Sequence, residues 1–293
     1  MGEDVLFTSF KWHPRMGNVA AITTSTGRVR LVILDWANFM IRGSQELPLM
    51  SDMETWCVAI SPPVDGTSMI YTGSDDGVLR YTSFSVLPLV VGPPGEDALQ
   101  PSIKSGETDE ARDTPLWEHQ YTHGPQMIAE ISASQGLIKR EHNAGVTAIL
   151  PLPSGSRDVA LVVTGSYDDH IRVFRLGLPH EHQWKAPRAL LERSLGGGVW
   201  ELKLMKCRVG GPQEGVTAEI LVSCMHAGPR IVRIHVNGSD AEMWVVYEFD
   251  GYEGFGGHTL NYASHFRGVE GTGIEFATTS FYDKKLHFWE FKP

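Results

Sequence analysis

Hydrophobic and polar positions alternate in short runs along much of the chain, and many of these runs end in a cluster of Gly, Ser and Asp. Such alternation is typical of half-buried β-strands bounded by tight turns. The clearest case is 164–174, where a strand end and a polar turn precede the apolar residues Ile171, Val173 and Phe174. The Asp of the turn can accept hydrogen bonds from neighbouring backbone amides. This stretch therefore predicts two strands joined by a braced turn.

Related stretches recur four more times, closely at 72–81 and 279–289 and with more divergence at 24–31 and 223–231. Each is preceded by a strand that opens with an aromatic or β-branched pair. These openings lie at 10–12, 56–58, 146–148, 199–201 and 260–262. A repeated unit of four short strands is the signature of a blade in a WD-repeat β-propeller. The sequence thus predicts an all-β fold with five recognisable blades.

One propeller domain is expected over 1–293, with a flexible insertion at about 85–142. The insertion contains Pro88 and a polar run at 104–113, which lack the apolar side chains needed to build a core. The run 127–131 is expected to return the chain to an outer strand.

Five blades are fewer than the seven that such rings commonly contain. Because the chain starts almost directly with strand residues, we expect a seven-blade relative that lacks about two N-terminal blades. A closed ring of five blades is the alternative. Without a neighbouring blade, the unit at 5–35 would expose one face, and the chain would be marginally stable and prone to associate.

The composition narrows the possible partners. A net charge of −10 disfavours nucleic acid, whose phosphates require clustered Lys and Arg, and suits a cationic ligand or a basic protein. Cys57, Cys207 and Cys224 have no spacing typical of a disulfide framework or a zinc site. Motifs for nucleotides, metals, secretion and membrane spans are missing, so we expect a soluble cytoplasmic protein without a cofactor.

Functional side chains are expected on one rim of the propeller. In a WD-type blade the first strand begins at the face to which the turn between the second and third strands returns. That rim is expected to carry Asp76, Asp168, Asp169, His170, Cys224, His226, His258, Tyr262 and Asp283, together with Trp56 and Trp200. The turn Asp residues are expected to brace their blades. The two indoles are either core residues or, beside an acidic rim, a site for a quaternary ammonium group.

Two residues of the fourth unit stand out. His226 takes the place that Asp fills in other units, so a catalytic and a structural role are both open for it. Cys224 is either a small buried filler or, with His226 as its base, a nucleophile.

The runs 197–200, 224–226 and 280–289, together with 54–56, 71–77 and 164–171, closely resemble the diphthine methylesterase family, WD-repeat proteins of diphthamide biosynthesis. The resemblance extends over the chain apart from 85–142. It implies hydrolysis of the methyl ester on methylated diphthine, a modified histidine of elongation factor 2. It also implies elongation factor 2 as the partner.

For that reaction His226 is the candidate general base, with Asp168 or Asp283 orienting it and Gly197 and Gly198 donating amides to the oxyanion. Cys224 is a nucleophile in a second version of the mechanism. The candidate substrate-binding residues are Trp56, Trp200, His258 and Tyr262. The alternative function is a non-catalytic scaffold for protein complexes, a common role of WD propellers. Mass spectrometry of elongation factor 2 from cells lacking the protein would separate the two.

Overall fold

The computed structural model shows an all-β protein. The residues it describes are 4–88, 127–132, 134–154, 156, 158–177, 186–211, 213–249, 260–268, 273–282 and 284–291. Within these ranges twenty strands form five antiparallel sheets, and no helix is present. The predicted fold class is therefore confirmed, with one sheet for each of the five predicted units.

The strands of each sheet follow one another along the chain. The first sheet contains β1 (Phe7–Trp12), β2 (Val19–Thr24), β3 (Val29–Asp35) and β4 (Met40–Glu46). The second contains β5 (Thr55–Ile60), β6 (Thr67–Ser74), β7 (Leu79–Pro88) and β8 (Met127–Ile131), with β9 (Gly136–Ile138) also paired to β7. The third contains β10 (Val146–Leu152), β11 (Val159–Ser166), β12 (His170–Gly177) and β13 (Arg188–Ser194). The fourth contains β14 (Val199–Val209), β15 (Val216–Cys224), β16 (Gly228–Asn237) and β17 (Asp240–Glu248). The fifth contains β18 (Ser264–Gly268), β19 (Ile274–Ser280) and β20 (Lys285–Phe291).

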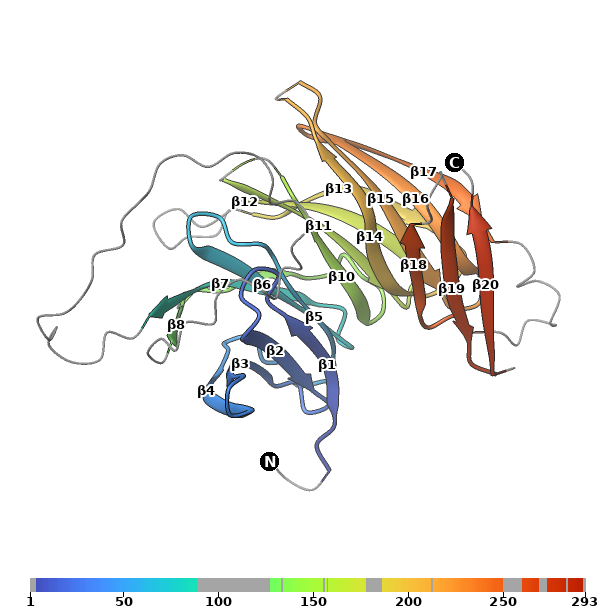
Figure 1. The fold of residues 1–293 in the computed structure, drawn as a ribbon. Coiled ribbons are helices and arrows are strands. Elements are labelled where there is room, and N and C mark those ends of the chain that lie inside the picture. Colours follow the sequence, from blue (N-terminus) through green and yellow to red (C-terminus); the bar gives the residue numbers. More distant parts are fainter. Residues whose placement is uncertain are drawn as a thin grey trace, which may run out of the picture.

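The five sheets are the blades of a β-propeller and succeed one another around a common axis (Figure 1). The first strand of each blade packs on the first strand of the next, from β1 through β5, β10 and β14 to β18. Apolar side chains fill the space between neighbouring blades. Leu31 of blade 1, for example, belongs to the same buried cluster as Val58 and Ile70 of blade 2. Each blade thus needs its neighbours to bury its faces.

An equivalent backbone hydrogen bond closes one end of every blade. In blade 3 the amide of Tyr167, just after β11, donates to the carbonyl of Gly145, just before β10, over 3.0 Å. The equivalent donor–acceptor pairs are Ser25–Leu6, Asp75–Glu54, Met225–Gly198 and Phe281–Leu260, at 2.8–3.0 Å. We call this end of the propeller the turn face. Because the bond recurs, residues that follow the second strand of each blade occupy matching places on the turn face.

The outermost strands show where the sequence-based boundaries fall short. Strand β8 confirms the predicted return strand at 127–131, while residues 89–126 of the predicted insertion lie outside the described residues. Strands β4 and β13 lie beyond the ends of the predicted stretches 5–35 and 164–174. Most of their side chains are exposed, so they lack the apolar alternation that identifies inner strands.

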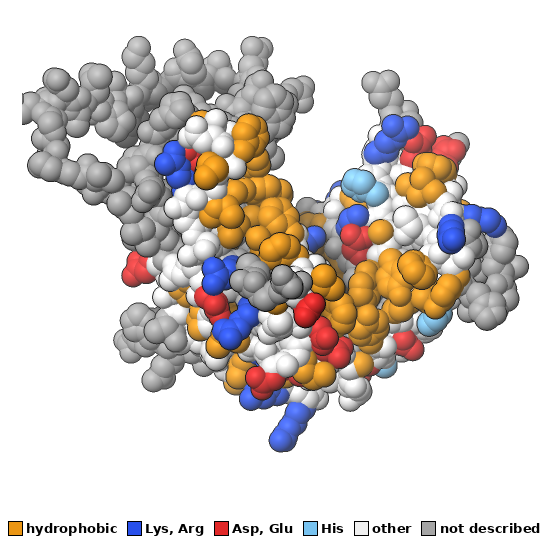
Figure 2. Space-filling view, turned by 90° about the horizontal axis from the view of Figure 1, so that it is seen from below, with side chains coloured by type: hydrophobic (Ala, Val, Ile, Leu, Met, Phe, Trp, Pro, Cys, Tyr) orange, Lys and Arg blue, Asp and Glu red, His pale blue; other side chains and the backbone are white. Residues whose placement is uncertain are grey.

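The two end blades turn apolar side chains to solvent. On the outer face of blade 1, Phe10 is 44% and Trp12 is 41% exposed, and on blade 5 Phe288 is 74% exposed. Extensive packing between β18 and β1 is not found among the described residues, unlike that between β1 and β5. Figure 2 shows apolar side chains gathered in patches on both sides of a hollow.

These faces predict self-association of the chain. Exposed apolar area of this kind is removed from water when molecules pair. We expect concentration-dependent oligomers in sedimentation velocity, and a shift toward monomer when Phe10→Ser and Phe288→Ser are combined. A control with Val64→Ser, also exposed but in the β5–β6 loop, should behave as wild type. A wild-type protein that stays monomeric at high concentration would contradict the prediction.

Candidate functional site

Five aromatic side chains from four blades meet on the turn face and form what we call the aromatic platform: Trp56, Tyr167, Trp200, Tyr262 and Phe281. The ring of Trp200 is central, with centroids 6.2 Å from Trp56, 5.4 Å from Tyr167 and 5.0 Å from Tyr262. The ring of Phe281 lies 5.7 Å from Tyr262. Phe281 is exposed and the other four are half-buried. The structure thus brings together three of the predicted substrate-binding residues, Trp56, Trp200 and Tyr262.

An acidic group lies at the edge of the platform. The Nε1–H of Trp56 donates to Oδ1 of Asp75 over 3.2 Å. Burial raises the pKa of Tyr167 to about 12, and the nearby Tyr262 and Asp75 add to the rise. Tyr167 therefore keeps its phenolic proton at neutral pH, and Asp75 is the acidic side chain beside the rings. Half-buried aromatic rings next to a carboxylate form a surface that attracts a quaternary ammonium group.

His226 lies in the turn between β15 and β16, at the place that Asp76 and Asp168 occupy in blades 2 and 3. Its side chain is exposed, and none of the described residues hydrogen-bonds its imidazole. The turn is close to the platform, because a Cβ added to Gly198 would lie 2.9 Å from Sδ of Met225 and 3.5 Å from Cα of Tyr167. An unrestrained imidazole on this face is chemically suited to exchange protons with a bound ligand.

The glycines before β14 are explained by close packing. A Cβ on Gly197 would approach the amide nitrogens of Ala227 and His226 to 2.8 and 3.2 Å. Only glycine fits there without movement of the backbone. The predicted role of Gly197 and Gly198 as oxyanion donors stays a prediction.

Asp168 has the contacts of a brace. Its carboxylate accepts hydrogen bonds from both terminal nitrogens of Arg172, at 2.7 and 3.0 Å, and from the amides of Asn143 and His170. Burial alone would raise the pKa of Asp168, but these hydrogen bonds and the Arg172 charge outweigh it and lower the pKa to about 2. Since both oxygens are occupied, the contacts of Asp168 favour the bracing role over the orientation of His226.

Cys224 is completely buried at the end of β15, and burial raises the pKa of its thiol to about 12. A buried thiol that keeps its proton is a poor nucleophile. The geometry therefore favours the filler role over the nucleophilic one.

Two candidate residues, His258 and Asp283, lie outside the described residues. Sequence reasoning missed Asp75, Tyr167 and Phe281, which lie one or two residues before the turn positions it selected. These three residues share one position, directly after the second strand of their blade. The recurring backbone hydrogen bond of the turn face identifies this position.

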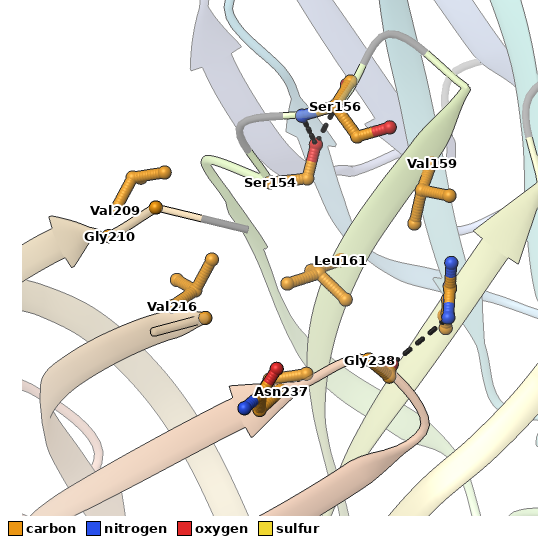
Figure 3. A pocket seen from close by; sticks show the side chains of 13 residues that line it. Ser154, Ser156, Val159, Leu161, Val209, Gly210, Val216, Asn237 and Gly238 are labelled. Carbon is orange, nitrogen blue, oxygen red and sulfur yellow. Dashed lines mark hydrogen bonds between the residues drawn. The ribbon is translucent and has the colours of Figure 1, made fainter. Parts of the chain in front are cut away.

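At the opposite ends of blades 3 and 4 there is a cavity of about 340 Å³, lined by the hairpins after β10, β14 and β16 (Figure 3). Its polar groups bond one another: Arg175 Nη1 donates to the carbonyl of Gly238, and the Ser156 amide donates to Ser154 Oγ. Since these groups are already paired within the protein, we assign the cavity no function.

Comparison with known proteins gives one sequence relationship. No model of a protein family matches the chain. A curated protein of Saccharomyces cerevisiae (strain ATCC 204508 / S288c) named "Diphthine methyltransferase" is 28% identical over 156 residues. The match covers 51% of this chain and 38% of that protein. Together with the propeller fold it gives weak support for a WD protein of the diphthamide pathway.

Solved structures show the fold alone. A chain in the crystal structure of BBS1N in complex with ARL6DN aligns with a TM-score of 0.53 at 12% identity, over 100% of this chain and 67% of that chain. The β-propeller domain of Myceliophteria thermophila Cps50 (Swd1) aligns with a TM-score of 0.47 at 11% identity, over 97% and 69% of the two chains. Across the described residues, no helix has the length and apolar character needed to cross a membrane.

Proposed function

We propose that this protein hydrolyses the methyl ester of methylated diphthine on elongation factor 2. The observation that carries the proposal is the aromatic platform beside Asp75. The resemblance to diphthine methylesterases implies a substrate side chain with a trimethylammonium group close to the ester. The name of the S. cerevisiae relative supports the same class of substrate.

The platform would bind the cation and so position the ester. A cation within about 6 Å of an aromatic centroid gains roughly 0.5 to 2 kcal/mol, more where water is excluded. Trp200 has three ring neighbours, so a methylated ammonium against it meets several aromatic rings and the Asp75 carboxylate. His226, on the same face, is the proposed base that activates water.

The name of the relative describes methyl transfer, whereas we propose methyl removal. Methyl transfer to the carboxylate of diphthine and hydrolysis of its methyl ester would concern the same carboxyl group. A carboxylate is already deprotonated at neutral pH and needs no base to accept a methyl group, whereas water must lose a proton to attack an ester. An exposed imidazole at the turn face therefore favours hydrolysis.

The test uses purified protein and elongation factor 2 that carries methylated diphthine. Mass spectrometry of the modified peptide should show loss of the ester methyl group, with release of methanol. A parallel reaction with unesterified diphthine and a methyl donor should leave the peptide unchanged. A gain of methyl in the second reaction would identify a transferase. If neither peptide changes, and diphthamide is normal in cells lacking the protein, the scaffold function is correct.

Trp200→Ala should raise KM for the methylated factor about tenfold, because loss of the central ring removes cation–π energy of this size. The matched control is Trp244→Ala, which removes an indole that is 46% exposed on the outermost strand of blade 4. Steady-state kinetics with both variants make the comparison. Equal KM values for wild type and Trp200→Ala would remove the platform from substrate binding.

A further inference from the structure

In blades 2 and 3 the turn Asp is bonded to an Arg four residues later. Asp76 holds Arg80 at 2.5 and 3.2 Å, and Asp168 holds Arg172 at 2.7 and 3.0 Å. Each guanidinium thus has a carboxylate on its two terminal nitrogens. In blade 3 the remaining nitrogen, Nε of Arg172, donates to Glu192 over 3.2 Å. Every nitrogen of that buried guanidinium therefore has an acceptor.

Blade 4 keeps the Arg and lacks the turn carboxylate. Arg230 pairs across the sheet with Val222 and Glu248, as Arg172 pairs with Thr164 and Glu192. At the Asp place stands the exposed His226. Arg230 is only 17% exposed, and its ion pair is a contact of 3.4 Å between Nη1 and Glu248, a side chain that is 59% exposed. Its buried Nε has no hydrogen-bond acceptor among the described residues.

A buried N–H group without an acceptor costs free energy that an incoming acceptor recovers. The planar guanidinium of Arg suits carboxylate oxygens in particular, because two parallel hydrogen bonds form at once. In blade 3 the Asp168 carboxylate lies below the turn and takes the two terminal nitrogens of Arg172, while Glu192 takes Nε. In blade 4 the place of the Asp168 carboxylate lies at the turn that carries His226, and among the described residues the acidic partner of Arg230 is the exposed Glu248 of the neighbouring strand.

We infer that Arg230 is an anion-binding residue that receives the oxyanion and then the carboxylate formed at the ester. This inference rests on the proposed hydrolysis and adds the group that stabilises its negative charge. A positive side chain aimed at the developing oxyanion lowers the barrier to ester hydrolysis. The water-activating base, His226, then lies in the turn between β15 and β16, and the anion-binding residue, Arg230, lies in β16 directly after that turn.

The step is balanced as follows. His226 takes a proton from water while the water oxygen bonds to the ester carbonyl carbon, and the carbonyl oxygen becomes an oxyanion paired with Arg230. The carbon–oxygen bond to the methoxy group then breaks. The imidazolium returns its proton to the leaving oxygen, which departs as methanol. The carboxylic acid formed then loses its proton to His226 and from there to solvent, and the product carboxylate remains paired with Arg230 until release.

The first experiment measures anion binding without any reaction. In ¹⁵N-labelled protein, the Nε–H resonance of Arg230, assigned with Arg230→Lys, is followed during titration with sodium acetate. We expect a saturable shift, and no shift for Arg172, whose acceptors are all within the protein. An Arg230 resonance that does not respond to acetate would overturn the inference.

The second experiment restores the missing carboxylate. His226→Asp should bond the two terminal nitrogens of Arg230, as Asp168 bonds those of Arg172. The new carboxylate should exclude acetate, and so abolish the acetate-induced shift, and should raise the melting temperature by about 2 °C. If His226→Asp leaves the acetate-induced shift unchanged, acetate does not bind where the turn carboxylate of blade 3 lies, and the inference is wrong.

The third experiment uses the reaction. Arg230→Gln should slow hydrolysis by about 100- to 1,000-fold, as for removal of an oxyanion donor. A normal rate in this variant overturns the inference and leaves the proposed function intact. If the wild type shows the acetate-dependent shift but does not hydrolyse the ester, the anion site is supported and the proposed esterase function is contradicted.

Discussion

Replacing His226 with Gln is expected to slow hydrolysis of methylated diphthine by about two to four orders of magnitude. Gln resembles His in size and polarity and does not take a proton from water. The fold should be unaffected, because the imidazole is exposed and no described residue hydrogen-bonds it. Binding of the substrate should survive, since the aromatic platform and Asp75 are untouched.

The measurement is methanol release under saturating substrate, combined with thermal melting of each variant. His235→Gln is the matched control, because His235 also belongs to β16 but lies near its far end, bonded to Thr217. The control should retain the wild-type rate. A His226→Gln protein with the same rate would exclude His226 as the base, and one that unfolds would show that its role is structural.

Asp168→Ala should destabilise the protein by on the order of 3 kcal/mol, because it leaves the buried charge of Arg172 without its main partner. Arg172 is 1% exposed, so water does not replace the lost carboxylate. Denaturant unfolding is the appropriate measurement. Asp76→Ala is the control and should cost less, since Arg80 is closer to solvent. An Asp168→Ala protein of wild-type stability that lacks activity would return Asp168 to the catalytic candidates.

The pH dependence of stability distinguishes the Asp168–Arg172 contact from the effects of other titratable groups. The folded pKa of Asp168, about 2, lies below the unfolded value near 4, so the ionised form stabilises the fold above about pH 4. That stability is lost as the pH falls through about 4 toward 2. Burial lowers the pKa of His13 and His142 to about 4, so their loss of stability occurs at higher pH, between about 6.5 and 4. The difference between wild type and Asp168→Ala should therefore shrink only below about pH 4.

The alternation of apolar residues and the recurring polar turn were sufficient to predict a propeller of five blades. Inner strands such as β11 and β12 are buried on both faces of their sheet, so their apolar residues leave a clear pattern. Strands β4 and β13 were not predicted because solvent, rather than another sheet, covers them, so their sequences lack the apolar pattern. The extra strand β9 consists of three residues, which is too short for a period to be recognised.

The sequence by itself also determined that Trp56, Trp200 and Tyr262 share one face with the turns, since that follows from strand direction within each blade. Only the tertiary structure decided which side chains touch there. Tyr167 reaches Trp200 because neighbouring blades pack their first strands together, whereas Asp75 reaches Trp56 within blade 2. Distances between blades depend on that packing and not on any local pattern. For the same reason the structure alone assigns Asp168 to Arg172 and leaves Arg230 without a turn carboxylate, since hydrogen-bond partners are chosen by geometry after the strands have assembled.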